Sequence, residues 1–427
     1  MNIIENPTDK EWKSLCERNI PDDLEIDKAV REIIDNVKAY GDSAVKHYSK
    51  RFDGFSADSF EVSAEEIEAA SKKVAPEVAV AIRSAAENIT KFHKAQLPDP
   101  VAVETMPGVR CIQRAMPIRR VGLYIPGGRA PLFSTVLMLA LPARIAGCRE
   151  IVLCTPDNPD HGIAPEILYA ASFCGIDKVY RIGGAQAIAA MGLGTNSIPK
   201  VDKIFGPGNR YVTKAKQEIS RFTAIDMPAG PSEVMVLADE SASPEFVAAD
   251  MLSQAEHGPD SQAIALCNSL DLAKNIKAEV DRLADLLPRR DSIEGSLSHS
   301  RIIVLDSRER MAEFANLYAP EHLIVSTRDP WEMADMIYAA GSVFIGNFSP
   351  ESAGDYASGT NHTLPTSGWA HSFSGVNIDS FMHKITYQEL TPEGLDLLRP
   401  VITSMARAEG LDAHALAVEI RTNSNSR

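Results

Sequence analysis

The sequence predicts an α/β protein built on parallel sheets, and three observations lead to this class. The chain has 427 residues, a length that favours two or three domains. Its composition, with 44% hydrophobic and 24% charged residues, is that of an ordinary globular protein. From Pro117 onward, short apolar segments alternate with segments of helical periodicity, as in sheets whose faces are covered by helices.

The first part of the chain is predicted to be mostly helical. Residues 1–22 lack a strong periodicity and are expected to form an arm. A helix is expected over 23–41, where apolar residues recur at helical spacing, and another over 76–96. Between them, Ser63-Ala-Glu-Glu66 matches a capping box, which opens a helix.

Two alternating series follow, and they predict two similar sheets. The first has strands at 120–125, 150–155, 178–182 and 203–205, with helices at 164–174, 185–191 and 210–219. The second has strands at 233–237, 262–267, 301–305, 322–325 and 342–345, with one helix ending near 257 and another at 272–287. A short tail with one helix is expected after Glu389.

Charge and hydropathy exclude several classes of protein. A formal net charge of −15 argues against a nucleic-acid or anionic membrane surface. There is no secretory signal pattern, and the longest apolar run, near 136–141, is too short to span a bilayer. The expected location is the cytoplasm. The six cysteines form no C-x-x-C pair and are interpreted as reduced thiols, not as disulfides or a thiolate zinc site.

One polar pair lies at a predicted helix end, in Asp250-Met-Leu-Ser-Gln-Ala-Glu-His-Gly-Pro259. Gln254 and His257 are three residues apart and therefore share a helical face, before Gly258 and Pro259 stop the helix. The helix dipole favours a cation at this end. The pair is either half of a metal site or a polar pair that caps the helix, and the spacing alone favours the second.

Three glycine-rich loops fall at the carboxyl ends of predicted strands, where open α/β sheets bind ligands. They are 126–129, 183–186 and 206–209. Glycine lets a phosphate approach backbone N–H groups at a helix start. Each loop could be a plain tight turn, and no G-x-G-x-x-G fingerprint is present. Three such loops in succession favour a nucleotide.

Further polar groups could carry chemistry. Glu321 and His322 precede a predicted strand as a possible acid/base pair, provided that both lie in the loop before it. A long loop over 349–365 contains Asp355 and His362, and His414 lies near the start of the tail helix. Gln254, His257, Asp355 and His414 would form an N/O metal site, but spacing cannot bring them together.

These motifs resemble those of histidinol dehydrogenases. The matching segments are 124–131, 183–188, 205–209, 226–233, 254–258, 320–322, 358–362 and 409–414, in family order over almost the whole chain. The resemblance implies a zinc-dependent, four-electron oxidation of L-histidinol to L-histidine through L-histidinaldehyde with two NAD⁺, the final steps of histidine biosynthesis.

The resemblance also implies residue roles. The implied ligands of one Zn²⁺ per subunit are Gln254, His257, Asp355 and His414, which hold the substrate through the ion. His322 would take the alcohol proton, and Glu321 would activate the water that hydrates the aldehyde. Further substrate contacts would be Ser232, His362 and Glu409. The positions that match the family's NAD contacts are Tyr124, Gln186 and Asn209.

The family fold implies two incomplete Rossmann-like parallel-sheet domains with extended N- and C-terminal segments in an intertwined homodimer. The expected boundaries are an arm at 1–22, a metal-carrying domain of 23–117 and 234–375, an NAD-contacting domain of 118–233, and a tail of 376–427. The tail would complete the partner's active site, so that His414 would act in trans.

Three other functions could account for part of the pattern. They are a dehydrogenase of the same fold for another alcohol, a zinc hydrolase using Glu321, and a non-catalytic metal-binding protein. The joint presence of the zinc, base and substrate positions argues against the first. The hydrolase leaves the nucleotide-like loops unused, and the third does not need Glu321 and His322. A thiol mechanism through Cys111 or Cys148 is disfavoured because neither has a neighbouring base in the sequence.

Overall fold

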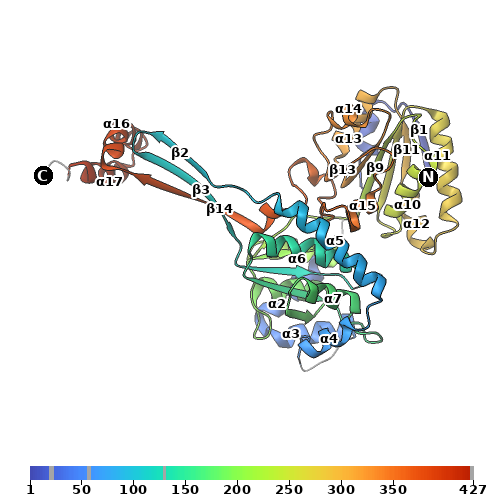
Figure 1. Ribbon diagram of the computed structural model, residues 1–427, viewed down its shortest axis with the longest axis horizontal. Coiled ribbons are helices and arrows are strands. Elements are labelled where there is room, and N and C mark those ends of the chain that lie inside the picture. Colours follow the sequence, from blue (N-terminus) through green and yellow to red (C-terminus); the bar gives the residue numbers. More distant parts are fainter. Residues whose placement is uncertain (19–23, 55–58, 128–130, 424–427) are drawn as a thin grey trace. The chain divides into compact units, whose positions relative to one another are not determined.

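The computed structural model describes residues 1–427 except 19–23, 55–58, 128–130 and 424–427. The chain divides into two compact units (Figure 1). The first unit comprises Met1–Gln96 and Arg119–Phe381, and the second comprises Leu97–Ile118 and Met382–Arg427. Part of the expected arm, the expected helix start at Asp23 and part of the 126–129 loop lie outside the described residues.

The first unit contains a five-stranded parallel sheet. Its order is β6 (Lys178–Arg181), β5 (Glu150–Thr155), β4 (Arg120–Tyr124), β7 (Lys203–Phe205) and β8 (Ala224–Ile225). The connecting helices are α6 (Phe133–Ala146), α7 (Pro165–Phe173), α8 (Gly184–Leu193) and α9 (Arg210–Ile219). Buried side chains of β4, β5, β6, β7, α8 and α9 form one core. The predicted strands and helices of the first series are therefore present.

The same unit contains a six-stranded parallel sheet. Its order is β1 (Asn2–Glu5), β11 (Arg301–Val304), β10 (Gln262–Cys267), β9 (Glu233–Ala238), β12 (His322–Ser326) and β13 (Ser342–Ile345). Its helices are α1 (Asp9–Leu15), α10 (Pro244–Ala255), α11 (Leu270–Ala284), α12 (Arg290–His299), α13 (Arg308–Tyr318), α14 (Pro330–Ala334) and α15 (Glu351–Tyr356). Separate apolar clusters cover its two faces. Burial on both faces explains the nearly continuous apolar strands.

The two sheets have the same topology. If β4 to β8 and β9 to β13 are each counted from one to five, both sheets have the order third, second, first, fourth, fifth. In one sheet, β5 and β6 are added on one side of β4, and β7 and β8 on the other side. The strand order therefore reverses between β4 and β7, and in the other sheet it reverses between β9 and β12. Such reversals leave a crevice for ligands. The expectation of two similar parallel sheets, consistent with Rossmann-like domains, is confirmed.

The packing of the N-terminal helices differs from the expected domain division. These helices are α2 (Leu24–Tyr40), α3 (Asp42–Tyr48), the π-helix η1 (Ser49–Asp53), α4 (Ala64–Ser71) and α5 (Pro76–Lys94). They were expected to join residues 234–375, but α2 packs on α8 and α9, α4 on α7, and α5 on α6. The apolar face of α2 shares one core with the five-stranded sheet. Residues 2–5 of the expected arm form the edge strand β1.

The second unit is an antiparallel sheet with two helices. Strand β3 (Val109–Pro117) lies between β14 (Met382–Leu390) and β2 (Val101–Met106), and helices α16 (Pro392–Ala408) and α17 (Asp412–Asn423) pack on each other (Figure 1). The first part of the chain is mostly helical, as expected, but strands β2 and β3 were not predicted, because β2 exposes nearly all its side chains and so lacks a buried-face pattern. The tail has two helices, not one.

The expected loop over 349–365 is not wholly irregular, since it contains the short helix α15 and then a segment without regular structure. Among the described residues, no helix is both long and apolar enough to cross a membrane. The cytoplasmic location stays a prediction that this finding does not test. All six cysteines are unpaired. Burial raises the pKa of Cys148 to about 12, which keeps its thiol protonated and unsuited to nucleophilic attack.

Candidate active site

Glu321 and His322 meet on the peptide groups of Glu233, at the amino ends of the neighbouring strands β9 and β12. The parallel register places His322 beside Val234. The backbone N–H of Glu233 donates to Glu321 Oε2 at 2.8 Å, and its carbonyl oxygen lies 3.2 Å from His322 Nδ1. Glu321 precedes the strand and His322 begins it, which allows both side chains to reach one place.

The ring of His322 has a defined orientation. Because a carbonyl oxygen only accepts hydrogen bonds, its contact with Nδ1 places a hydrogen on that nitrogen. The other nitrogen, Nε2, is buried and makes no hydrogen bond within the described part of the chain, although Asp355 Oδ1 lies 3.5 Å away. The ring therefore directs an unshared nitrogen toward Asp355.

Burial and charge shift the pKa values of the pair. Burial raises the pKa of Glu321 to about 8, against the opposing effects of His322 and of the Glu233 N–H. Burial would lower the pKa of His322, but the carboxylates of Glu351 and Glu321 outweigh it and raise that pKa to about 10. Such perturbed groups are typical of sites that transfer protons.

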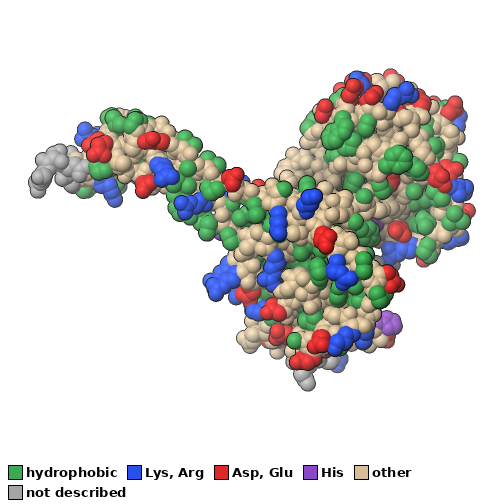
Figure 2. Space-filling view, viewed as in Figure 1, with side chains coloured by type: hydrophobic (Ala, Val, Ile, Leu, Met, Phe, Trp, Pro, Cys, Tyr) green, Lys and Arg blue, Asp and Glu red, His purple; other side chains and the backbone are tan. Residues whose placement is uncertain are grey.

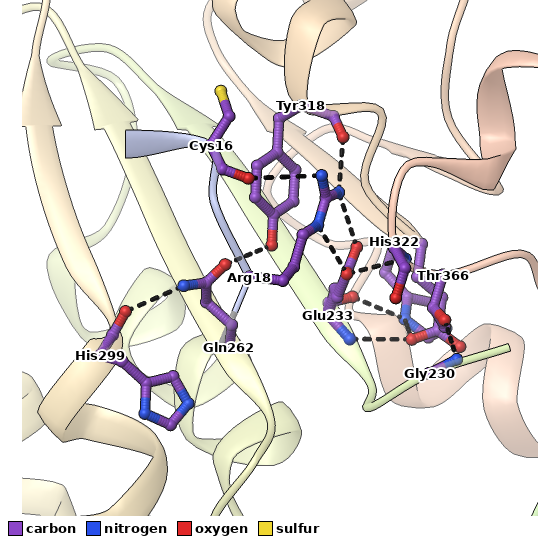
Figure 3. Close-up of polar contacts among 11 residues, drawn as sticks. Cys16, Arg18, Gly230, Glu233, Gln262, His299, Tyr318, His322 and Thr366 are labelled. Carbon is purple, nitrogen blue, oxygen red and sulfur yellow. Dashed lines mark hydrogen bonds and ion pairs between the residues drawn. The ribbon is translucent and has the colours of Figure 1, made fainter. Parts of the chain in front are cut away.

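A buried ion pair fixes the side chain of Glu233. Arg18 Nε lies 2.9 Å from Glu233 Oε1, and Arg18 Nη2 lies 3.1 Å from Oε2 (Figure 3). The guanidinium stacks over the Tyr318 ring, 3.8 Å from its centroid, and donates to the Tyr318 carbonyl. The Ser367 N–H also donates to Glu233 Oε1, at 2.8 Å. Residues from distant parts of the chain thus hold Glu233, whose peptide groups contact Glu321 and His322.

A group of metal-ligand types lies beside His322. Ligand atoms of His257, Glu351 and Asp355 lie within 4.8 Å of one another. Gln254 joins this group, because its amide reaches the carboxylate of Glu351. Glu351 and Asp355 are four residues apart on α15, and His257 follows the end of α10. Imidazole, carboxylate and amide groups are the N/O donors of a divalent cation.

Sequence reasoning missed Glu351. It is 1% exposed, and burial raises its pKa to about 8. The only signal in the sequence was its spacing of four residues from Asp355, which is informative only once a helix is expected there. In a segment rich in small residues, no such helix was expected.

The remaining predicted substrate contacts are divided between the two units. His362 is held at both ring nitrogens, by the Asp355 carbonyl at 2.9 Å and the Thr135 hydroxyl at 3.1 Å. Ser232 immediately precedes β9, and its carbonyl accepts from the Gln262 N–H. Glu409 and His414 belong to the second unit, where both are exposed. His414 lies in the first turn of α17.

The predicted nucleotide-contacting residues lie at the carboxyl edge of the five-stranded sheet. Tyr124 ends β4, and its hydroxyl accepts from the Gly184 N–H at 3.0 Å. Gln186 donates to Asp53 at 3.1 Å, while its buried Oε1 has no partner within the described chain. Asn209 caps α9 by accepting from the Val212 N–H. The orphaned amide oxygen of Gln186 suits a ligand that donates a hydrogen bond.

The loop after β7 approaches β4 closely at one glycine. Gly206 has φ +126, and an added Cβ would lie 2.1 Å from the Tyr124 carbonyl oxygen. Its N–H donates to Asp226, and its carbonyl accepts from the buried Lys216. Only glycine permits this conformation and this contact. The loop that leads to Asn209 is therefore fixed against the end of β4.

The two parallel sheets, the glycine-rich loops at a strand reversal and the buried Glu321–His322 pair are those of an α/β enzyme with a candidate nucleotide site. A sequence model of histidinol dehydrogenase matches residues 16–422. The chain is 54% identical to the histidinol dehydrogenase of Bacteroides fragilis over 422 residues, covering 99% of both chains. It is 53% identical to that of Escherichia coli, covering 93% of this chain and 92% of the other.

A solved structure of a histidinol dehydrogenase is also similar to this chain. The crystal structure of histidinol dehydrogenase from Elizabethkingia anophelis superimposes with a TM-score of 0.97 at 50% identity, covering 100% of this chain and 99% of that one. The chain therefore belongs to the histidinol dehydrogenase family, the NAD-dependent oxidoreductases of histidine biosynthesis. Family membership favours the dehydrogenase interpretation over the hydrolase and the non-catalytic protein.

The Arg18–Glu233 pair yields a stability prediction. Arg18→Met should lower the free energy of unfolding by about 3–5 kcal/mol, because the carboxylate of Glu233 stays buried without its partner. Urea unfolding followed by circular dichroism measures the change. The matched control is Arg31→Met, which breaks an ion pair whose arginine is 60% exposed and should cost less than about 1 kcal/mol. Equal losses in the two variants would contradict the anchoring role.

Proposed function

We propose that this enzyme oxidises L-histidinol to L-histidine through L-histidinaldehyde, using two NAD⁺ and one Zn²⁺ per subunit, in the final steps of histidine biosynthesis. The observation that carries the proposal is the contact of Glu321 and His322 with the two peptide groups of Glu233, beside the N/O cluster. Family membership over almost the entire chain supports the same reaction.

The donor groups of the cluster fit a zinc ion. Gln254, His257 and Asp355 would be ligands from the first unit, and His414 would be the fourth. When bound, zinc would supply Lewis-acid and orienting chemistry, by holding the amine and imidazole of the substrate. Two of the proposed ligands lie at or just after the end of α10 and one lies on α15; α10 packs on β9 and β10, and α15 packs on α10.

His322 would act as the base of the first oxidation. In the neutral ring, Nε2 would take the proton of the alcohol O–H while the carbon loses a hydride, which NAD⁺ would accept. In that neutral ring, a hydrogen bond from Nδ1 to the Glu233 carbonyl favours the tautomer that has its lone pair on Nε2. A cation beside Asp355 would also oppose the raised pKa of His322, because it offsets the surrounding carboxylates.

Glu321 would act in the second oxidation. Its carboxylate would accept a proton from the water that adds to the aldehyde, giving the hydrate that loses the second hydride. Burial raises its pKa to about 8, so that it is a stronger proton acceptor than an exposed glutamate. The hydrogen bond from Glu233 would direct its remaining oxygen toward the substrate.

Other residues would contact the ligands. Ser232, at the amino end of β9, and His362, held by Thr135 and Asp355, would bind the substrate from the first unit. Glu409 would bind it from the second unit. For NAD, the proposed contacts are Tyr124, Gln186 and Asn209, which border the strand reversal beside β4.

The second unit is poorly suited to exist without a partner, and we assign the enzyme as an intertwined homodimer on that basis. It has few buried apolar residues. Many apolar side chains are exposed on its surface (Figure 2). The exposed ones include Val101, Val103, Met116, Leu397, Val401, Met405, Leu411, Leu416 and Ile420. A second copy of the chain would cover this surface, and His414 and Glu409 would then complete the partner's site.

Loss of the proposed base should abolish turnover without removing the metal. His322→Ala should lower kcat by about 10²–10⁴-fold, since the alcohol proton has no acceptor. Steady-state NADH formation measures kcat, and metal analysis of the purified protein checks that zinc is retained. The exposed His161 provides a control, because His161→Ala should keep full activity. Turnover by His322→Ala near that of the wild type would rule out this base.

Subunit mixing tests the shared site. His414→Ala and His322→Ala are each expected to be inactive, but reassorted together they should regain about a quarter of wild-type activity. Half of the randomly paired dimers are hybrids, and each hybrid has one intact site. A mixture of His322→Ala with His257→Ala should regain nothing, because both residues lie in the first unit. Differently tagged chains confirm subunit exchange. If exchange occurs and the mixture of His414→Ala and His322→Ala stays inactive, action of His414 in trans is refuted.

A further inference from the structure

We propose that Glu351 is a positioning residue that holds the amide nitrogen of Gln254 and thereby directs the amide oxygen of Gln254 toward the cation. This inference rests on the proposed function, which makes Gln254 a ligand. It assigns a task to a buried carboxylate that the reaction itself does not use.

The hydrogen bonds of Gln254 are satisfied in one orientation of its amide. With the nitrogen directed at Glu351, Nε2 lies 2.6 Å from Oε1 and 3.1 Å from Oε2 of that carboxylate. In the opposite orientation, the amide oxygen would face two acceptor oxygens. The two orientations have the same shape, so that only the hydrogen-bond partners decide between them. An amide has two N–H donors, and the carboxylate offers two acceptors.

Among the described residues, Glu351 offers the amide nitrogen of Gln254 its shortest contact, at 2.6 Å. Gln254 is fully buried, and Glu351 is 1% exposed, so that water does not satisfy either group. The Ser253 hydroxyl lies 3.4 Å from Glu351 Oε2, a longer contact than either contact of the amide. His322 Nδ1 lies 3.2 Å from the amide nitrogen but is already directed at the Glu233 carbonyl.

The orientation decides whether Gln254 can bind a metal. An amide binds a cation through its oxygen, because the lone pair of the nitrogen is delocalised into the carbonyl and the N–H groups repel a positive charge. The Glu351 carboxylate takes the nitrogen side of the amide, which leaves the amide oxygen directed away from it. Groups that orient a ligand in this way typically change metal affinity by 10–100-fold.

Direct ligation by Glu351 is the competing account, since its carboxylate lies within the same group as His257 and Asp355. Two neutral substitutions distinguish positioning of Gln254 from direct ligation by Glu351. Glu351→Gln keeps an acceptor oxygen for the Gln254 amide, and Glu351→Met has a similar length but no comparable acceptor. Both remove the negative charge, so that the difference between them reports the hydrogen bond.

The experiment measures zinc affinity of the full-length apoprotein by competition with a chromophoric chelator, without substrate or NAD. Glu351→Met should bind Zn²⁺ at least about 10-fold more weakly than Glu351→Gln. When both are repeated in a Gln254→Ala background, this difference should disappear, because the orienting contact has no amide to act on. Glu294→Met, at an exposed glutamate, should bind like the wild type.

Each outcome supports or overturns the positioning role of Glu351. Equal affinities of Glu351→Gln and Glu351→Met, or a difference that persists with Gln254→Ala, would overturn the positioning role. If Glu351→Met does not fold, as judged by circular dichroism, Glu351→Leu replaces it in the same comparison. A wild-type protein that binds no zinc would instead refute the proposed function, so that the two failures are distinguishable.

Discussion

The site depends on one peptide segment at Glu233. Its N–H and carbonyl groups point to the two neighbouring side chains that would move protons, and its own carboxylate is fixed by Arg18. Because strand β9 is central in its sheet, this segment cannot shift without disturbing the pairing with β10 and β12. Glu321 and His322 are therefore placed by backbone geometry and not by packing of their own side chains alone. Such rigid support is what proton transfer at a fixed distance requires.

The residues proposed for the reaction lie at opposite edges of the two sheets. The glycine-rich loops lie at the carboxyl ends of β4 and β7, where open α/β sheets ordinarily bind ligands. The acid/base pair lies at the amino ends of β9 and β12. The 355–362 segment connects them, since His362 contacts Thr135 in the first turn of α6, and Asn361 donates to the Met138 carbonyl. A reaction between a nucleotide and an alcohol is compatible with this arrangement.

Much of the fold could be predicted from the sequence, because buried strands and amphipathic helices leave a periodic pattern. Helix α9 has the expected bounds at Arg210 and Ile219, and the capping box at Ser63 is present. The hairpin over Val101–Pro117 left no such pattern, because its strands bury few side chains. Helix α15 was missed because six residues are too few to establish a period.

Fewer of the site residues than of the helices and strands could be predicted from the sequence. Gln254 and His257 were found as a spaced pair and Glu321 and His322 as neighbours, but residues that act through backbone groups have no side-chain signature. Glu233 contributes through its peptide groups, and Arg18 lies 215 residues away along the chain. Glu351 became visible only when a fold brought α10 and α15 together. The family resemblance supplied the roles, and the structure supplied the contacts that support them.

The central claim is that one site carries out both oxidations with a metal-held substrate. The most direct measurement is the amount of NADH formed per L-histidinol consumed, before and after the protein is treated with a chelator. The account predicts two NADH per alcohol, since a four-electron oxidation requires two hydride transfers, and it predicts loss of this yield on chelation with recovery on adding Zn²⁺. One NADH per alcohol, or an undiminished yield from metal-free protein, would contradict it.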